Sequence, residues 1–192
     1  MASKKSKAVQ KIEPVEAKPL KLNMGSGGSL MEGFFQVDMS PGPHVDLVMD
    51  IGTTPWPWSA ETVDEIWCRH AFEHLKPQQR LNFVNEAYRV LKPDGFITMI
   101  TPHWTSARAY GDLTHEWPPV CEMSWYYLNE DWRNKEASHT NKDYCCNFEA
   151  TWGYQLRGDV TVKNQEYQMF AMQNFVQAIE DMHATLRKKP RL

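Results

Sequence analysis

The stretch Ile66–Leu75 (IWCRHAFEHL) holds residue types that could bind a metal ion. It reads H-x-x-E-H from His70 to His74, which is the zinc signature of the inverzincin peptidases. On a helix, histidines four residues apart lie on one face, where they could share a Zn²⁺ ion with Glu73 beside them as general base. A five-residue pattern in a chain with seven histidines is weak evidence. Whether this pattern binds a metal ion therefore depends on the secondary structure that the neighbouring residues predict.

Composition sets the first bounds. The 192 residues are 42% apolar and 23% charged, which is typical of one well-buried globular domain. The net charge of -3 gives no indication of nucleic-acid binding, which usually needs a basic face. No apolar run approaches the roughly 18 to 20 residues that span a bilayer, and no apolar signal segment follows the N-terminal lysines. We therefore expect no membrane contact and a cytoplasmic location.

The four cysteines stand at positions 68, 121, 145 and 146, without a C-x-x-C pair. This spacing favours free thiols in a reducing compartment and argues against a structural zinc site. The first nineteen residues hold five lysines and almost no large apolar side chain. They are too polar to form a packed core, so residues 1–19 are predicted to be a flexible basic tail before one domain at 20–192.

Short apolar runs that end in glycine, aspartate or proline predict successive strands. These runs cover residues 20–24, 34–38, 44–50, 63–68 and 96–100. Apolar residues at helical spacing predict a helix over 78–91, which Lys92–Gly95 ends with a turn. Strands that are apolar on both faces and alternate with helix or turn indicate an open parallel α/β sheet. Ligands bind such sheets beyond the carboxyl ends of the strands.

Chemically distinctive residues gather at those strand ends, which predicts one cleft. Glycines at 25, 27 and 28 would let the backbone approach an anionic group, and Asp38 could accept hydrogen bonds from ribose hydroxyls. A nucleoside-containing ligand is therefore favoured. A dinucleotide is disfavoured, because Leu30 stands where the third glycine of G-x-G-x-x-G is required.

Four segments together resemble the successive motifs of class I S-adenosylmethionine-dependent methyltransferases, the small type 11-like members in particular. They are LNMGSGG, FQVDMSPGPHVDLVMDIGTTPWPW, VDEIWCRHAFEHL and AYRVLKPDGFITMITP, within residues 20–103. The resemblance implies a Rossmann-like, seven-stranded, mostly parallel sheet with helices on both faces. It also implies a shortened first helix, an aromatic-rich lid inserted after strand five at about 103–147, and S-adenosyl-L-methionine as cofactor.

The resemblance further implies which residues bind the cofactor. The glycine turn would lie under the methionine part, the acid after strand two would bind the ribose, and residues after strand three would flank the adenine. The implied contacts are Asn23, Gly25, Ser26, Gly27, Asp38, Met39, Asp50, Ile51, Arg69 and His70. Asn23 departs from the acidic residue that many members carry before the turn.

The same resemblance addresses the H-x-x-E-H pattern. In the family an E-H-L segment follows strand four and walls the cofactor cleft, whereas an inverzincin needs another acidic ligand far downstream. No metal site is therefore expected, and His70 and His74 are interpreted as hydrogen-bonded wall residues.

The methyl acceptor is expected to lie against the segment after strand five. That segment is rich in Trp, Tyr and His, and Asp112 with His115 resembles the D-x-T-H motif of small type 11-like members. His115 and His103 are the candidate general bases and Asp112 a residue that could orient them, since histidine titrates near neutral pH. The alternative is that the aromatics fill a lid core and the histidine ties a loop.

The remainder of the chain is predicted to complete the seven strands. Residues 134–147 read as a polar loop, 148–156 and 183–187 as strands, and 165–180 as a helix whose methionine and aromatic residues belong to the core.

The predicted function is S-adenosylmethionine-dependent methyl transfer to an unidentified acceptor, in the first place a small molecule. The alternative is a non-catalytic S-adenosylmethionine-binding protein with a regulatory or assembly role. The motif of nucleic-acid amino-methylating enzymes is absent, because Thr101–Trp104 occupies its place. The oligomeric state and the methylated atom stay open.

Overall fold

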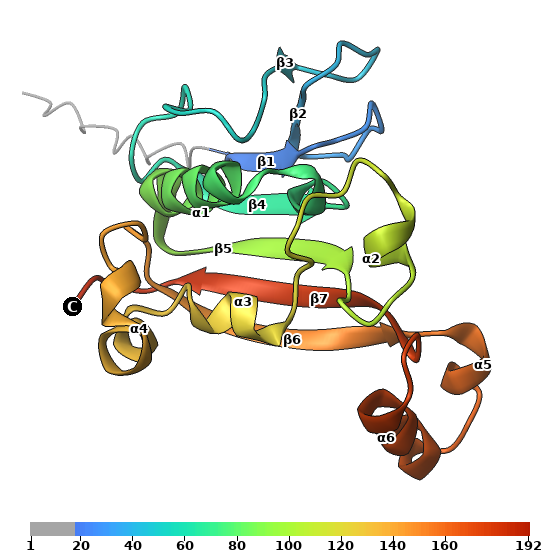
Figure 1. The fold of residues 1–192 in the computed structure, drawn as a ribbon. Coiled ribbons are helices and arrows are strands. Elements are labelled where there is room, and N and C mark those ends of the chain that lie inside the picture. Colours follow the sequence, from blue (N-terminus) through green and yellow to red (C-terminus); the bar gives the residue numbers. More distant parts are fainter. Residues whose placement is uncertain (1–17) are drawn as a thin grey trace, which may run out of the picture.

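The computed structural model describes residues 18–192, which form a twisted sheet with short helices (Figure 1). The predicted tail, residues 1–19, lies almost entirely outside the described residues. The strands are β1 (Lys21–Met24), β2 (Phe35–Asp38), β3 (Leu47–Val48), β4 (Val63–Arg69), β5 (Leu91–Pro102), β6 (Phe148–Leu156) and β7 (Ile179–Lys188). The helices are α1 (Pro77–Val90), α2 (Arg108–Gly111), α3 (Glu122–Tyr126), α4 (Glu130–Glu136), α5 (Gly158–Thr161) and α6 (Gln165–Asn174), with 3-10 turns η1 (Phe72–His74) and η2 (Ser138–Thr140). None of these helices is long and apolar enough to cross a membrane.

The seven strands lie in the order β3-β2-β1-β4-β5-β7-β6. The first five are parallel to one another, and β7 runs antiparallel to both β5 and β6. This confirms the predicted seven-stranded, mostly parallel α/β sheet. The chain order reverses between β1 and β4, so their carboxyl ends form the switch point where ligands bind in such sheets.

The main core lies on one face of the sheet. Alternate strand residues such as Leu22, Ile66 and Met99 are fully buried there beneath α1 and α3. On α3 the indole Nε1 of Trp125 donates to the sulfur of Met182 on β7 at 3.3 Å. Figure 1 shows α1 and α3 on the same side of the sheet. The two helices that enter the main core therefore share one face of the sheet.

No helix connects β1 to β2, and the connecting loop covers the opposite face at this point. Gln36 is 1% exposed, and its side-chain amide donates to the backbone oxygens of Met31 and Phe34 in that loop. The ammonium of Lys21 lies 5.4 Å from the ring centre of Phe34. The loop thus replaces the first helix, in agreement with its predicted shortening.

Several element boundaries differ from prediction, and β3 is shorter than the predicted strand at 44–50. Residues 92–95, expected as a turn, form a bulge inside β5, because β4 pairs first with Leu91 and next with Phe96. Asp94 has a φ of 62°, which gives this bulge the sharp bend of a turn. The predicted helix 165–180 ends at Asn174, and β7 begins at Ile179, four residues before the predicted start.

The interpretation of the α6 aromatics as core is wrong. Tyr167, Phe170 and Phe175 are 41%, 51% and 45% exposed. The buried side of α6 instead uses the small residue Ala171, which packs in a separate cluster with Val160, Ala178 and Leu156. Figure 1 shows α5 and α6 beyond the end of β6, away from the helices over the main core. The aromatic side chains therefore have no sheet to pack against.

Candidate active site

A cleft of about 600 Å³ lies at the carboxyl ends of β1, β2 and β4. Its lining combines the glycine turn, two strand-end aspartates and the wall after β4. The lining residues are Gly25, Gly27, Asp38, Met39, Ser40, Met49, Asp50, Ile51, His70, Ala71, His74, Leu75, Gln79 and Thr114.

The glycine turn is pressed directly against the wall after β4. Gly25 has a φ of 78°, and a Cβ added to it would lie 2.3 Å from the Cβ of Ala71. The backbone amides of Gly25 and Ser26 both donate to the carbonyl of Val37, at 2.9 and 3.0 Å. A side chain at position 25 would therefore be strained in conformation and would also collide with the wall.

Asp38 ends β2 and closes onto the glycine turn. Its carboxylate accepts from the amide of Gly27 at 2.7 Å and from the amide of Ser40 at 2.9 Å. Asp50 follows β3 and accepts from the amide of Gly52 at 2.8 Å and from the side-chain amide of Gln79 at 3.1 Å. Both carboxylates are thus oriented by protein donors at the rim of the cleft.

His70 stands between two carboxylates on the cleft wall. Its Nδ1 lies 3.2 Å from Glu73 Oε1, and its Nε2 lies 3.5 Å from Asp181 Oδ2. Asp181 also pairs with Arg108 at 3.1 Å. The neighbouring carboxylates of Asp181 and then of Glu73 raise the pKa of His70 to about 9. The imidazole is therefore positively charged at neutral pH, and it lines the cleft.

The H-x-x-E-H segment does not form the helix of a zinc peptidase. His70 follows the end of β4 with a φ of 50°, and only residues 72–74 form a single 3-10 turn. His70 contacts the carboxylates of Glu73 and Asp181, whereas His74 contacts Thr114 Oγ1 at 3.0 Å. The two histidines therefore do not share one helical face.

Seven of the ten predicted cofactor residues line the cleft. They are Gly25, Gly27, Asp38, Met39, Asp50, Ile51 and His70. Arg69 is exposed and lies outside the lining. Ser26 also lies outside the lining, and it is 8% exposed with a buried hydroxyl that has no hydrogen-bond partner among residues 18–192.

Asn23 is the third predicted cofactor residue that lies outside the cleft lining. Its side chain is 7% exposed, lies on the sheet face opposite the main core and donates to Gln36 Oε1 at 2.7 Å. It stabilises the β1–β2 pair and does not line the cleft.

The sequence reasoning missed Gln79 and Thr114 as lining residues. Gln79 reaches Asp50 from the first turn of α1, and Thr114 reaches His74 from 40 positions away in the sequence. Thr114 had a usable signal, since it lies inside the D-x-T-H motif. No sequence signal marked Gln79 as a lining residue, because glutamines are common on exposed helix turns.

The structure places two of the three candidate catalytic residues, His115 and Asp112, near each other. The His115 Nδ1 contacts the carbonyl of Ala109 at 3.2 Å, and Nε2 lies 4.0 Å from Asp112 Oδ2. The His115 ring centre is 4.5 Å from that of His74, which lines the cleft. Asp112 is exposed, and hydrogen bonds from Thr114 lower its pKa.

His103 lies apart from this group. It is 2% exposed and outside the cleft lining, and its ring nitrogens contact Thr105 Oγ1 at 2.8 Å and Glu122 Oε1 at 3.1 Å. Glu122 also accepts from the hydroxyl of Tyr154 at 2.8 Å. His103 therefore belongs to a polar network that ties the segment after β5 to β6.

The fold matches solved methyltransferases. A S-adenosylmethionine-dependent methyltransferase from Archaeoglobus fulgidus aligns with a TM-score of 0.63 at 14% identity, over 88% of this chain and 86% of its own. A Burkholderia thailandensis enzyme, 1,6-didemethyltoxoflavin-N1-methyltransferase with bound 1,6-didemethyltoxoflavin and S-adenosylhomocysteine, aligns at 0.53 and 13% identity, over 90% and 72%. A chain of the complex between the Trm112 methyltransferase activator and a methyltransferase of Haloferax volcanii aligns at 0.53 and 14% identity, over 93% and 86%. No curated protein sequence matches the chain significantly.

These likenesses define the fold as that of class I S-adenosylmethionine-dependent methyltransferases. Residues 35–99, which include β2, β4 and most of β5, match the family model described as a methyltransferase domain. The chain thus has the fold of this class and contains a segment that matches its methyltransferase domain model.

Proposed function

We propose that the cleft at the ends of β1, β2 and β4 binds S-adenosylmethionine and that the chain transfers the methyl group to a small-molecule acceptor. The observation that carries this proposal is the convergence of Gly25, Asp38 and His70 on one cleft of about 600 Å³. The D-x-T-H segment reaches the same cleft through Thr114.

The residues of the cleft fit the three parts of the cofactor. Gly25 lines the cleft without a side chain, so its backbone can contact a ligand directly. Ala71 leaves no room for a larger residue at this position. The carboxylate of Asp38 suits the two ribose hydroxyls, and Asp50 with Ile51 would flank the adenine. The charged imidazole of His70 suits the carboxylate of the methionine part. When bound, the cofactor supplies a sulfonium-activated methyl group.

The segment between β5 and β6 would hold the acceptor. Trp104, Leu113 and Trp117 are 45%, 97% and 72% exposed near the start of this segment. Leu113 precedes Thr114, which lines the cleft. Apolar side chains of this segment would cover a bound acceptor and exclude water, which is the contribution that a protein makes to a displacement reaction. We therefore propose that the insertion at about 103–147 holds the acceptor and that its part around Thr114 covers the cleft.

His115 is the stronger candidate for a general base when the acceptor must lose a proton. Ala109 O can only accept, so Nδ1 of His115 carries the hydrogen and Nε2 keeps its lone pair. Asp112 Oδ2 lies 4.0 Å away and would stabilise the imidazolium that forms when His115 accepts the proton. His103 is the weaker candidate, because its contact with Glu122 would have to open first.

The first test is calorimetric titration with S-adenosylmethionine and S-adenosylhomocysteine. Asp38→Asn should weaken binding by about ten- to a hundredfold, because hydrogen bonds to a charged group contribute roughly 1.5–3 kcal/mol. Asp131→Asn, an exposed position on α4, is the matched control and should bind like the intact protein. Unchanged affinity in Asp38→Asn would contradict the ribose assignment.

The second test compares acceptor methylation by His115→Ala and His103→Ala once an acceptor has been found. We expect the first variant to lose most of the turnover and the second to lose less. Equal turnover in both variants and the intact protein would remove the base assignment. Cofactor binding without methylation of any acceptor class would favour the alternative, a non-catalytic regulatory role.

A further inference from the structure

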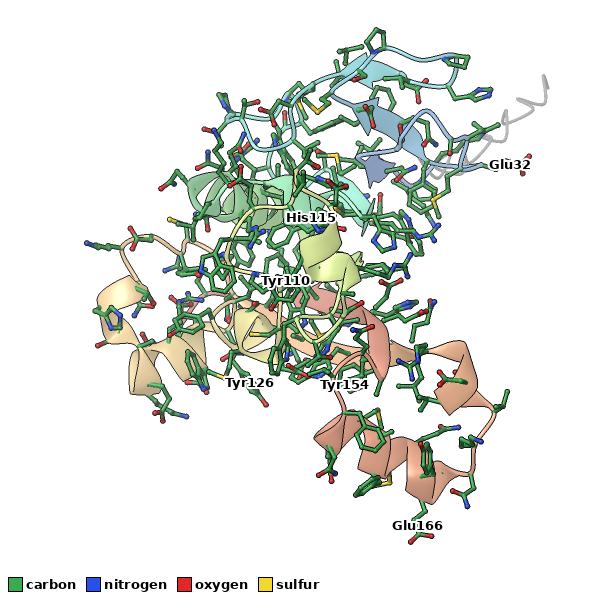
Figure 2. The ribbon with its side chains drawn as sticks, turned by 45° about the vertical axis from the view of Figure 1, so that its right-hand side comes forward. Glu32, Tyr110, His115, Tyr126, Tyr154 and Glu166 are labelled. Atoms are coloured by element: carbon green, nitrogen blue, oxygen red, sulfur yellow. The ribbon has the colours of Figure 1, made fainter. Side chains whose placement is uncertain are left out.

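Three metal-ligating side chains meet beside the cleft. Glu73 and His74 come from η1, and His115 comes from the segment after α2. One ligand atom from each lies within 4.8 Å of the other two. Figure 2 shows His115 beside α2. This set differs from the H-x-x-E-H reading of the sequence, because His115 takes the place of His70.

The hydrogen bonds of both histidines leave Nε2 ready to bind a metal. Thr114 Oγ1 donates its hydrogen to Asp112 Oδ1 at 2.7 Å, so it must accept from His74 Nδ1–H at 3.0 Å. His115 Nδ1 donates to the carbonyl of Ala109. In both neutral rings the lone pair is therefore on Nε2. Metal-binding histidines show this arrangement, with the other ring nitrogen held by a carboxylate, carbonyl or hydroxyl.

Glu73 provides an independent indication of a ligand. It is 5% exposed, and its Oε1 accepts from His70. Its Oε2 is buried without a hydrogen-bond partner among the residues that the structure describes. An unpartnered buried carboxylate oxygen is costly, and a bound cation would satisfy it.

We propose that Glu73, His74 Nε2 and His115 Nε2 bind a divalent transition-metal ion, with Zn²⁺ as the first candidate. Two imidazoles and one carboxylate are a known zinc set that leaves a coordination position open. Ligands about 2.0–2.1 Å from one tetrahedral ion lie roughly 3.4 Å apart, so the side chains need to close by about an ångström. His74 lines the cleft, so an ion held by this set would lie at the cleft wall.

The metal would bind an anionic or hydroxyl oxygen of the acceptor and lower the pKa of that hydroxyl. This role rests on the proposed methyl transfer, but the binding of the ion does not. A His115 that ligates the metal no longer acts as general base, so the base assignment applies to metal-free protein.

The test is titration of tag-free protein with ZnCl₂, followed by calorimetry, and with Co²⁺, followed by visible absorption. We expect one ion per chain. His74→Ala and His115→Ala should each weaken binding at least tenfold, and so should Glu73→Gln. His183→Ala, an exposed histidine on β7, is the matched control and should bind normally. Thr114→Val keeps the shape of the residue, removes only the support of His74, and should weaken binding about tenfold.

The outcomes separate this proposal from the proposed function. Absence of stoichiometric Zn²⁺ binding, or binding that His74→Ala and Thr114→Val leave unchanged, would overturn the metal site. A parallel titration of the same samples with S-adenosylmethionine tests the cofactor cleft alone. Cofactor binding without zinc binding would support the proposed function and overturn the metal site. Zinc binding without cofactor binding would support the metal site and overturn the proposed function.

Discussion

Substitution of Gly25 by alanine tests the contact between the glycine turn and the wall after β4. The native φ of 78° costs an alanine about 1–2 kcal/mol. The new Cβ would also lie 2.3 Å from the Cβ of Ala71, and such overpacking costs typically about 1–3 kcal/mol. The free energy of unfolding should therefore fall by about 2–5 kcal/mol.

Gly27→Ala is the matched control for the backbone strain. Its φ is 60°, but a Cβ there would meet no atom within 4 Å. It should therefore lose only about 1–2 kcal/mol. At roughly 2–4 °C per kcal/mol for a chain of this size, the melting temperature should fall by about 4–20 °C for Gly25→Ala and about 2–8 °C for Gly27→Ala.

The assay is thermal unfolding without cofactor, followed by circular dichroism, on a double-mutant cycle with Ala71→Gly. Removing the Ala71 methyl group relieves the collision and leaves the strain in φ, so the cycle should show a favourable coupling of about 1–3 kcal/mol. Equal destabilisation by Gly25→Ala and Gly27→Ala would refute the reasoning, and so would a coupling near zero.

Three further predictions concern burial. Burial raises the pKa of the Cys146 thiol to about 12, and the neighbouring Cys145 is exposed, so alkylation at pH 8 followed by peptide mass analysis should label Cys145 first; equal labelling would contradict the burial. Phe170→Ala, at an exposed position of α6, should cost less than about 1 kcal/mol in denaturant unfolding, whereas Phe148→Ala in the core should cost about 3–5 kcal/mol. Asn23→Ala should lower stability by about 1–3 kcal/mol, because it leaves the buried Oε1 of its glutamine partner on β2 without a donor; a large loss of S-adenosylmethionine affinity would show that Asn23 acts in the cleft after all.

The spacing of apolar runs and turn residues was sufficient to predict the parallel sheet. Each run ends in residues that strands avoid, so Gly25, Asp38 and Asp50 could be assigned to one edge without knowledge of the fold. Whether Asn23 contacts the ligand could not be predicted. The strand alternates between polar Lys21 and Asn23 and apolar Leu22 and Met24, but it is buried on both faces, so the alternation does not show which face lies nearer the ligand.

The other features that the sequence could not show are contacts between residues that are distant in sequence. The helical spacing of aromatics in α6 was read correctly as a helix, but spacing cannot show whether another element covers them. The pairing of His74 with Thr114 joins residues 40 positions apart. The metal pattern in the sequence was local, whereas the cluster in the structure combines η1 with the D-x-T-H segment. Only the folded arrangement replaces His70 by His115.

The arm formed by α5 and α6 should have a lower local stability than the central strands of the sheet. It rests on a small cluster around Ala171, while β5 and β7 are joined along seven consecutive residue pairs. Backbone amides of α6 should therefore exchange with deuterium through local opening, and those of β5 only through global unfolding. A partner that covers the aromatic side of α6 would slow exchange in this arm and leave the exchange of the central strands unchanged.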